Sequence, residues 1–255
     1  PEVFAADLAR IQHRHWLFAG YAFQIPKPGN YFTYQVETES IIVVRDRAGE
    51  IRAFHNVCPH RGRKLIDTPE GKRNARGNKR AIICGFHGWT YDIDGRNSYI
   101  LDEDDWHGAL KPECTSLTPV RVDTWGGFIY IDQREEEGET LAEYLGDAGR
   151  ILSHFEFEKM RYKWRQYCVY PANWKTAIEA FMEPYHTTAT HHQLTAFAEF
   201  YAYSKQYGLH SVSGFDQRKS AEATSQGGSV SRAGKGADPR ISTYELAYEN
   251  YTTIN

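Results

Sequence analysis

Carboxylate and imidazole side chains gather in the segment Ala172–Gln193. Glu179 and Glu183 stand four positions apart, and His186 follows Glu183 by three. Residues at i, i+4 and i+7 share one face of a helix, so these three side chains are expected to point the same way. His191 comes five positions after His186. On a regular helix with 3.6 residues per turn, that spacing is about 140°.

One metal ion can bind both imidazoles only if the helix breaks or distorts between them. The sequence supplies reasons for a break, because Pro184 lacks a backbone donor and Thr187, Thr188 and Thr190 disfavour a helix. A buried carboxylate with two histidines is what a mononuclear metal centre needs. A plain helix with a few hydrogen-bonded core residues is the alternative that this segment leaves open.

A second set of metal-binding residue types lies upstream, as CPH at 58–60 and CGFH at 84–87. Two cysteines and two histidines could hold a tetrahedral structural zinc ion. Zinc fingers of that composition usually place both cysteines in one loop and both histidines on a helix, whereas here each loop offers one of each. This pairing favours a [2Fe–2S] cluster in which two histidines replace two cysteines on one iron. Glycines at 62 and 88 would let backbone amides approach the sulfides.

Composition limits the classes of partner and compartment. The chain has 255 residues, 41% of them hydrophobic, and a net charge of −3. That charge gives no reason to expect nucleic acid or a membrane surface as partner. No run of about 18 apolar residues or signal peptide is present, and the missing initiator Met indicates a trimmed start. Two of the four cysteines stand beside histidines, which favours metal binding in a reducing compartment, the cytoplasm.

Short strands separated by turns dominate the first half of the chain. A helical start within 5–23 gives way to aromatic residues. Strands are expected over 40–46, 50–57, 80–84, 89–93 and 118–132, which predicts a small antiparallel β domain over about 36–134. The basic segment at 70–80 is interpreted as a solvated surface loop, although it could also steer an acidic electron donor.

The second half mixes helix and strand signals. The acidic run at 135–139 predicts a domain boundary, and an amphipathic helix is expected over 140–155. Strands are expected over 161–170 and 243–254. The segment 211–238 is rich in Ser, Gly and charge and is expected to be a mobile loop.

These motifs resemble a known family. CPHRG at 58–62 with CGFHGWTYD at 84–92 resembles the Rieske signature. NWKTAIEAFMEPYHTTATHHQ at 173–193 resembles the catalytic motif of the α subunits of Rieske non-haem iron ring-hydroxylating oxygenases. The family pattern is a carboxylate, two residues, a histidine, four residues and a histidine, and Glu183, His186 and His191 occupy those places.

The resemblance implies an α+β fold. An antiparallel β Rieske domain would be inserted into a helix-grip (START/Bet v1-like) catalytic domain that is only partly visible. Residues 1–35 would form a lead segment that packs on the catalytic domain, 36–134 the Rieske domain, and 135–255 the first part of the catalytic domain. In the cluster, one iron would be held by Cys58 and Cys84 and the other by His60 and His87.

The second motif implies a mononuclear Fe(II) site. His186 and His191 would be two ligands of a 2-His-1-carboxylate triad, whose third ligand is not identifiable in this chain. Glu183, which is usually Asp in the family, would bridge electron transfer to a Rieske histidine of a neighbouring subunit. A minority of relatives with Glu at this place act on quaternary amines such as carnitine.

The implied function is the terminal component of an oxygenase. Electrons from NAD(P)H would arrive through a reductase, with or without a ferredoxin, and O2 would be used to hydroxylate an apolar, aromatic small molecule. The assembly would be a homotrimer, alone or with a β subunit. The first alternative is monooxygenation or N-demethylation of a tertiary or quaternary amine. The second is a Rieske electron carrier or ligand-binding protein without a working iron site.

Overall fold

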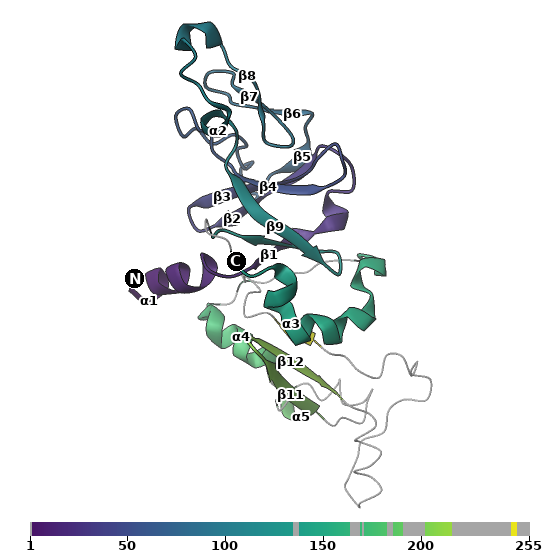
Figure 1. The fold of residues 1–255 in the computed structure, drawn as a ribbon. Helices are drawn as coiled ribbons and strands as arrows, with labels where there is room; N and C mark the ends of the chain where they lie inside the picture. The colour runs from purple at the N-terminus through teal and green to yellow at the C-terminus, as the bar shows by residue number, and fades with distance from the viewer. Residues whose placement is uncertain are drawn as a thin grey trace, which may run out of the picture. The chain divides into compact units, whose positions relative to one another are not determined.

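The computed structural model describes residues 2–134, 138–163, 169, 171–182, 186–190, 202–215 and 246–248 (Figure 1). The chain forms two compact units, Pro1–Leu141 and Ala142–Asn255. The division into segments 1–35, 36–134 and 135–255 stays a prediction. In the described part of the chain, no helix combines the length and apolar character needed to cross a membrane.

The first unit begins with the expected helical start. Helix α1 (Glu2–Asp7) runs into a π-helical segment, Leu8–Gln12. The aromatic stretch that follows forms strand β1 (Leu17–Tyr21), which pairs antiparallel with β10 (Phe128–Asp132). Residues 17–21 are therefore part of the main sheet.

Seven antiparallel strands make this sheet, in the order β1-β10-β9-β4-β3-β2-β5. The remaining members are β2 (Asn30–Val36), β3 (Glu39–Arg45), β4 (Ile51–His55), β5 (Arg76–Asn78) and β9 (Pro119–Trp125). The predicted hairpin over 40–57 is confirmed by β3 and β4, and the strands predicted over 118–132 are confirmed by β9 and β10.

Burial on both faces explains why β3 forms. Ile41, Ile42, Val43 and Val44 are each at most 1% exposed, and β-branched side chains favour a strand. Ile42 and Val44 belong to a core cluster that also contains residues of a small second sheet. That sheet consists of β6 (Ala81–Ile83), β7 (Thr90–Asp92) and β8 (Asn97–Tyr99). It carries the second Cys/His loop, which places that loop over the Ile42 face.

The basic segment 70–80 is not entirely a loop, so that prediction is wrong for three residues. Strand β5 pairs with β2, with Asn78 opposite Asn30. A Cβ atom at Gly77 would lie 3.1 Å from the Tyr31 hydroxyl, so the absence of a side chain allows this close pairing. All three residues of β5 are exposed, as a solvated segment requires.

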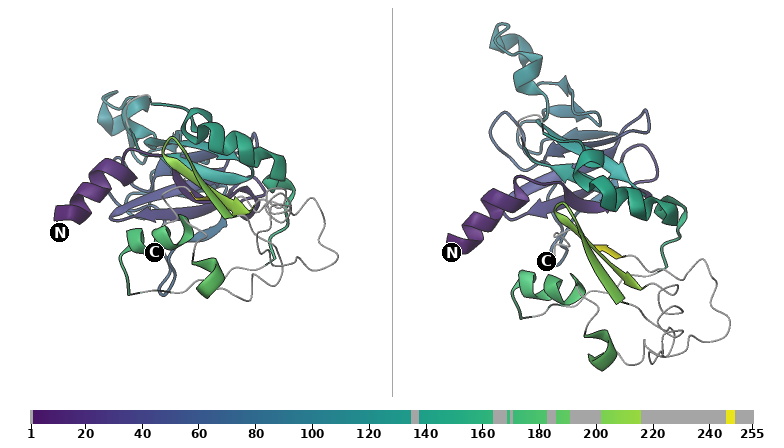
Figure 2. Two further views of the ribbon diagram at one scale, coloured as in Figure 1. Left: turned by 90° about the horizontal axis from the view of Figure 1, so that it is seen from below. Right: turned by 60° about the horizontal axis from the view of Figure 1, so that its bottom comes forward.

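The second unit contains helices and a separate three-stranded sheet. The helices are α3 (Leu141–Leu152), α4 (Trp174–Met182) and α5 (Thr187–Thr190). Strands β11 (Ala202–Tyr207), β12 (His210–Phe215) and β13 (Leu246–Tyr248) pair in that order, and the β11–β12 hairpin is clear in Figure 2. The helix predicted over 140–155 is confirmed by α3, which kinks at Gly146.

Several other predictions for this unit need correction. Residues 211–215 form β12 instead of a loop, because Val212 is buried, and residues 216–238 lie outside the described residues. The threonines expected to break the helix form the short helix α5, so their effect was overestimated. The strand predicted over 243–254 is confirmed at Leu246–Tyr248. Residues 161–163 are in no strand, and most of the strand predicted over 161–170 lies outside the described residues.

Candidate metal centres

Two loops with the same backbone hydrogen bonds carry the upstream cysteines and histidines. The Gly62 N–H donates to the Cys58 carbonyl at 2.9 Å, and the Gly88 N–H donates to the Cys84 carbonyl at 3.0 Å. In both loops the cysteine N–H donates to the carbonyl five positions later, at 2.8 Å. The repeated geometry makes the two loops equivalent halves of one site.

Both glycines are required by the backbone. Gly62 has φ +69° and Gly88 has φ +73°, a left-handed conformation that costs other residues about 1–2 kcal/mol. No other protein atom lies within 4 Å of the position that a Cβ atom would take at either glycine. The loops therefore turn tightly and leave room beside their backbone amides.

The two cysteines lie close together in the core. Cys58 and Cys84 are each 2% exposed, and neither forms a disulfide. Burial raises the pKa of the Cys58 thiol, Cys84 raises it further, and a hydrogen bond with Tyr91 partly opposes this. A cation at this place would therefore be needed to hold the sulfurs as thiolates.

Tyr91 supplies a hydrogen bond to the sulfur pair. Its hydroxyl oxygen lies 3.0 Å from Cys58 Sγ, and its side chain is fully buried. Burial, followed by the Cys58 hydrogen bond, raises the pKa of Tyr91. The phenol thus stays protonated and can donate its O–H to a thiolate sulfur.

The two histidines form a second pair. The ring centroids of His60 and His87 are 4.7 Å apart, and both side chains are half-buried. Burial lowers the pKa of His60, and the charges of His87 and Arg61 lower it further. A neutral imidazole keeps a nitrogen lone pair available for a metal.

This donor set fits a [2Fe–2S] cluster. The sulfurs form one pair and the imidazoles another, as two irons with unlike ligands require. A tetrahedral zinc ion would need all four donors around one point, whereas a sulfur pair and an imidazole pair suit two irons with unlike ligands. The ligand assignments of Cys58, His60, Cys84 and His87 nevertheless remain proposals.

The downstream motif is described only in part. Asn173 caps the start of helix α4, because its side-chain oxygen accepts the Lys175 N–H at 2.9 Å. His186 is half-buried, and its carbonyl accepts the Thr190 N–H at 2.8 Å, so it begins α5. Glu183 and His191 lie outside the described residues. Their roles, and that of His186, stay predictions.

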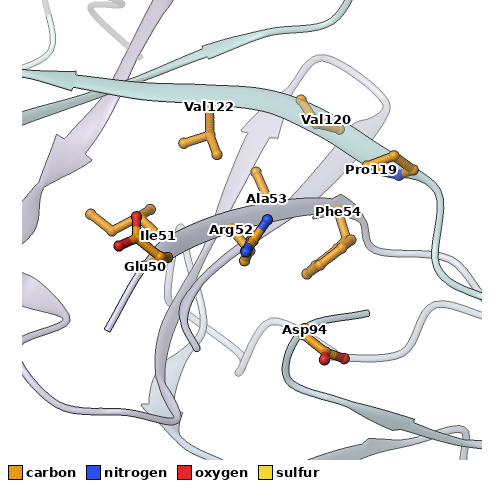
Figure 3. A pocket seen from close by; sticks show the side chains of 9 residues that line it. All are labelled: Glu50, Ile51, Arg52, Ala53, Phe54, Asp94, Pro119, Val120 and Val122. Carbon is orange, nitrogen blue, oxygen red and sulfur yellow. The ribbon is translucent and has the colours of Figure 1, made fainter. Parts of the chain in front are cut away.

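A pocket of about 460 Å³ lies in the first unit, where β4 and β9 pair through only two residues each (Figure 3). Its lining includes Phe54 and Val120, and Glu50, Arg52 and Asp94 bring charges to it. It contains none of the predicted site residues. We assign no part of the metal chemistry to it.

Sequence reasoning missed three aromatic residues around the first site. Trp89 and Tyr91 fall inside the CGFHGWTYD motif, and their spacing of two would have put both on one face of a strand. Trp106 contacts His60 edge-on, with ring centroids 5.8 Å apart. No spacing signal links Trp106 to the motif, so only the fold reveals this contact.

Two known families match the chain in succession. Residues 15–105 match the Rieske [2Fe-2S] domain, and residues 157–249 match the catalytic domain of the ring hydroxylating alpha subunit. The chain belongs to the Rieske ring-hydroxylating oxygenases. This membership confirms the predicted α+β fold class with an antiparallel β Rieske domain. It also implies the predicted cofactors, a Rieske cluster and a mononuclear iron that uses O2.

The relatives include enzymes named for quite different substrates. The oxygenase subunit of glycine betaine monooxygenase from Chromohalobacter salexigens is 35% identical over 194 residues, covering 76% of this chain and 42% of the relative. The large oxygenase component of the naphthalene 1,2-dioxygenase system from Pseudomonas aeruginosa is 36% identical over 200 residues, covering 74% of this chain and 42% of the relative. The chain thus spans about two fifths of the length of these curated relatives.

A solved structure shares the fold. The crystal structure of a quaternary ammonium Rieske monooxygenase in complex with L-carnitine matches with a TM-score of 0.71. The match covers 84% of this chain and 59% of that chain, at 24% sequence identity. At this identity the likeness supports the fold alone.

Proposed function

We propose that this chain is part of the terminal component of a Rieske oxygenase that hydroxylates an apolar, aromatic small molecule with O2. The observation that carries this proposal is the side-by-side cysteine and histidine pairs, followed by a match to the catalytic domain over 157–249. When bound, the cluster supplies electrons and the mononuclear iron activates O2. Cys58, Cys84, His60 and His87 hold the cluster.

The protein's own residues hold and orient the two metal groups. Tyr91 donates a hydrogen bond to Cys58, while burial keeps water from the sulfur pair. His186 and His191 hold the mononuclear iron together with a carboxylate that this chain does not identify. Glu183 bridges electron transfer to a Rieske histidine of a neighbouring subunit, which makes a homotrimer, with or without a β subunit, the proposed assembly.

The electron source is a reductase, with or without a ferredoxin, that draws on NAD(P)H. Four exposed cations of segment 70–80 favour an acidic donor by electrostatic attraction: Lys72, Arg73, Arg76 and Arg80. Two buried cysteines outside disulfides fit a cytoplasmic enzyme.

A second candidate is oxygenation or N-demethylation of a tertiary or quaternary amine. Glu183 in place of the family's usual Asp favours it, as does the 35% identity to a glycine betaine monooxygenase subunit. The identity to the naphthalene dioxygenase component is almost the same, 36%, so overall similarity does not decide between the substrates.

The test uses the purified full-length protein with its reductant. Iron and acid-labile sulfide are measured first, followed by O2 consumption and product analysis with naphthalene and glycine betaine. A cis-diol or phenol supports the first proposal, and a demethylated amine supports the second. A cluster without mononuclear iron and without O2 consumption would favour a pure electron carrier instead.

Variants of the downstream motif separate its proposed roles. His186→Ala should lose mononuclear iron while the cluster absorbance stays. Glu183→Gln should keep both metal groups and slow electron transfer between subunits by at least about tenfold, a loss of ~1.4 kcal/mol. His154→Ala removes an exposed histidine from the same unit and serves as the control. Rapid oxidation of the reduced cluster in Glu183→Gln would contradict the bridging role.

A further inference from the structure

The imidazole of His60 is surrounded by aromatic rings. It stacks on Trp89, with ring centroids 4.7 Å apart and an interplanar angle of 8°. Trp106 meets it edge-on at 5.8 Å and 80°. Trp89 and Trp106 also contact each other at 6.2 Å and 75°, so each ring restrains the other two.

Within the described chain, ring contacts and not hydrogen bonds hold this imidazole. Histidines that bind metals usually donate their second ring N–H to a carboxylate, a carbonyl or water. The hydrogen bonds found in the described part of the chain include none from the His60 ring. The rings that contact it in the described chain are those of Trp89, Trp106 and His87, and of these the two tryptophans are not proposed metal ligands.

Trp106 reaches His60 from a strained turn. It ends the 3-10 helix Glu103–Trp106, which is bracketed by Asp102 with φ 52° and His107 with φ 51°. Both are non-glycine residues in the left-handed region, which costs energy at each position. Strain of this kind persists only where the surrounding structure demands it and often marks a functional position. Here the turn presents an indole to a metal-binding imidazole.

We propose that Trp106 is a positioning residue that orients His60 and shields the histidine end of the cluster from water. This inference rests on the proposed assignment of His60 as a cluster ligand. Reduction adds one negative charge to the cluster, and water stabilises the more highly charged form. Covering His60 therefore disfavours reduction and lowers the potential, since solvent exposure is one of the properties that set it. The ring neighbour of His87 is instead Phe86, with ring centroids 4.0 Å apart, and Phe86 is itself 59% exposed.

The test compares Trp106→Ala, Trp106→Phe and Tyr99→Ala in the full-length protein with its cluster. Tyr99 is 53% exposed on the same small sheet and serves as the matched control. The readouts are cluster content, the reduction potential and the nitrogen couplings of the histidines in pulsed EPR. None of them depends on turnover.

Trp106→Ala should raise the equilibrium constant for reduction by up to about tenfold, which is ~59 mV for one electron. One histidine nitrogen coupling should broaden as His60 gains freedom. Trp106→Phe should restore both values towards the wild type, and Tyr99→Ala should change neither. If the alanine variant loses its cluster, Trp106→Leu, which keeps apolar bulk without a ring edge, replaces it in the comparison.

Two results would overturn the inference. The first is an alanine or leucine variant that keeps its cluster with wild-type potential and couplings. The second is a control that shifts as much as the alanine variant, because the effect would then come from general exposure. A wild-type protein without a [2Fe–2S] cluster would overturn the cluster assignment itself, and this inference with it.

Discussion

Tyr91→Phe tests whether a single hydrogen bond adjusts the potential of the cluster. The Tyr91 hydroxyl lies 3.0 Å from Cys58 Sγ, and the ring is fully buried in the core. Phenylalanine keeps the ring and its packing and removes only the O–H donor. Because sulfur carries more negative charge when the cluster is reduced, the donor stabilises the reduced state more strongly. Its removal should lower the potential.

The size of the shift follows from the hydrogen bond. A hydrogen bond to a charged group contributes about 1.5–3 kcal/mol. Only the difference between the two redox states changes the potential, and we take it as roughly half, about 0.8–1.5 kcal/mol. A tenfold change in the equilibrium constant, ~1.4 kcal/mol, corresponds to ~59 mV for one electron, so the potential should fall by about 30–65 mV.

The assay is a redox titration of the purified protein followed by absorbance and EPR. Tyr31→Phe is the control, because Tyr31 packs against the same core cluster. Burial raises the pKa of Tyr91, so its phenol remains protonated and the shift should be the same across about pH 6 to 9. A Tyr91→Phe potential equal to the wild type or higher would refute the argument.

Two stability predictions use matched positions in the first unit. Gly95 and Gly49 both have φ +90°, but a Cβ atom at Gly95 would lie 2.3 Å from Phe54, whereas none lies within 4 Å at Gly49. Urea unfolding should show Gly95→Ala costing about 1–3 kcal/mol more than Gly49→Ala, and equal losses would contradict this clash. Burial alone would raise the pKa of Asp46, but hydrogen bonds from the Arg52 side chain and from backbone N–H groups lower it. The Asp46 carboxylate therefore stabilises the fold above its unfolded pKa of about 3.9, and that stability is lost as the pH falls through the lower folded pKa. Asp46→Asn should lower the free energy of unfolding by about 1–2 kcal/mol at pH 7 and by less in acid. An equal loss of stability in acid would show that ionisation of Asp46 is not the cause.

The sequence was a good guide to the metal-binding donors because chemistry restricts their types and spacing. Each loop needs one cysteine, one histidine and a glycine four positions after the cysteine, and all of these are visible in the chain. The contacts that adjust the site are different. Tyr91 reaches Cys58 across 33 positions, and Trp106 reaches His60 only through a strained turn. Packing sets these contacts, and the local pattern places Tyr91 on a face of a strand without naming the cysteine that it reaches.

The difference between local pattern and tertiary packing also explains which strands were predicted. Strand β3 is an uninterrupted run of β-branched residues, so its pattern shows it directly. Strand β5 consists of Arg, Gly and Asn and has low intrinsic preference for a strand. It forms because it can pair with the edge of β2, where Gly77 lies opposite Tyr31 and leaves room for the tyrosine ring. Tertiary pairing thus decides the structure where local preference is weak.

The two proposed cluster histidines have different ring neighbours, which bears on how electrons would leave the cluster. Trp89 and Trp106 contact His60, whereas His87 contacts Phe86, which is 59% exposed. If Glu183 of another subunit makes the proposed bridge, we expect it to approach His87. Glu183→Gln should change one histidine nitrogen coupling and leave the other as in the wild type. Equal changes in both nitrogen couplings would show that the aromatic contacts of His60 and His87 do not determine which histidine makes the bridge.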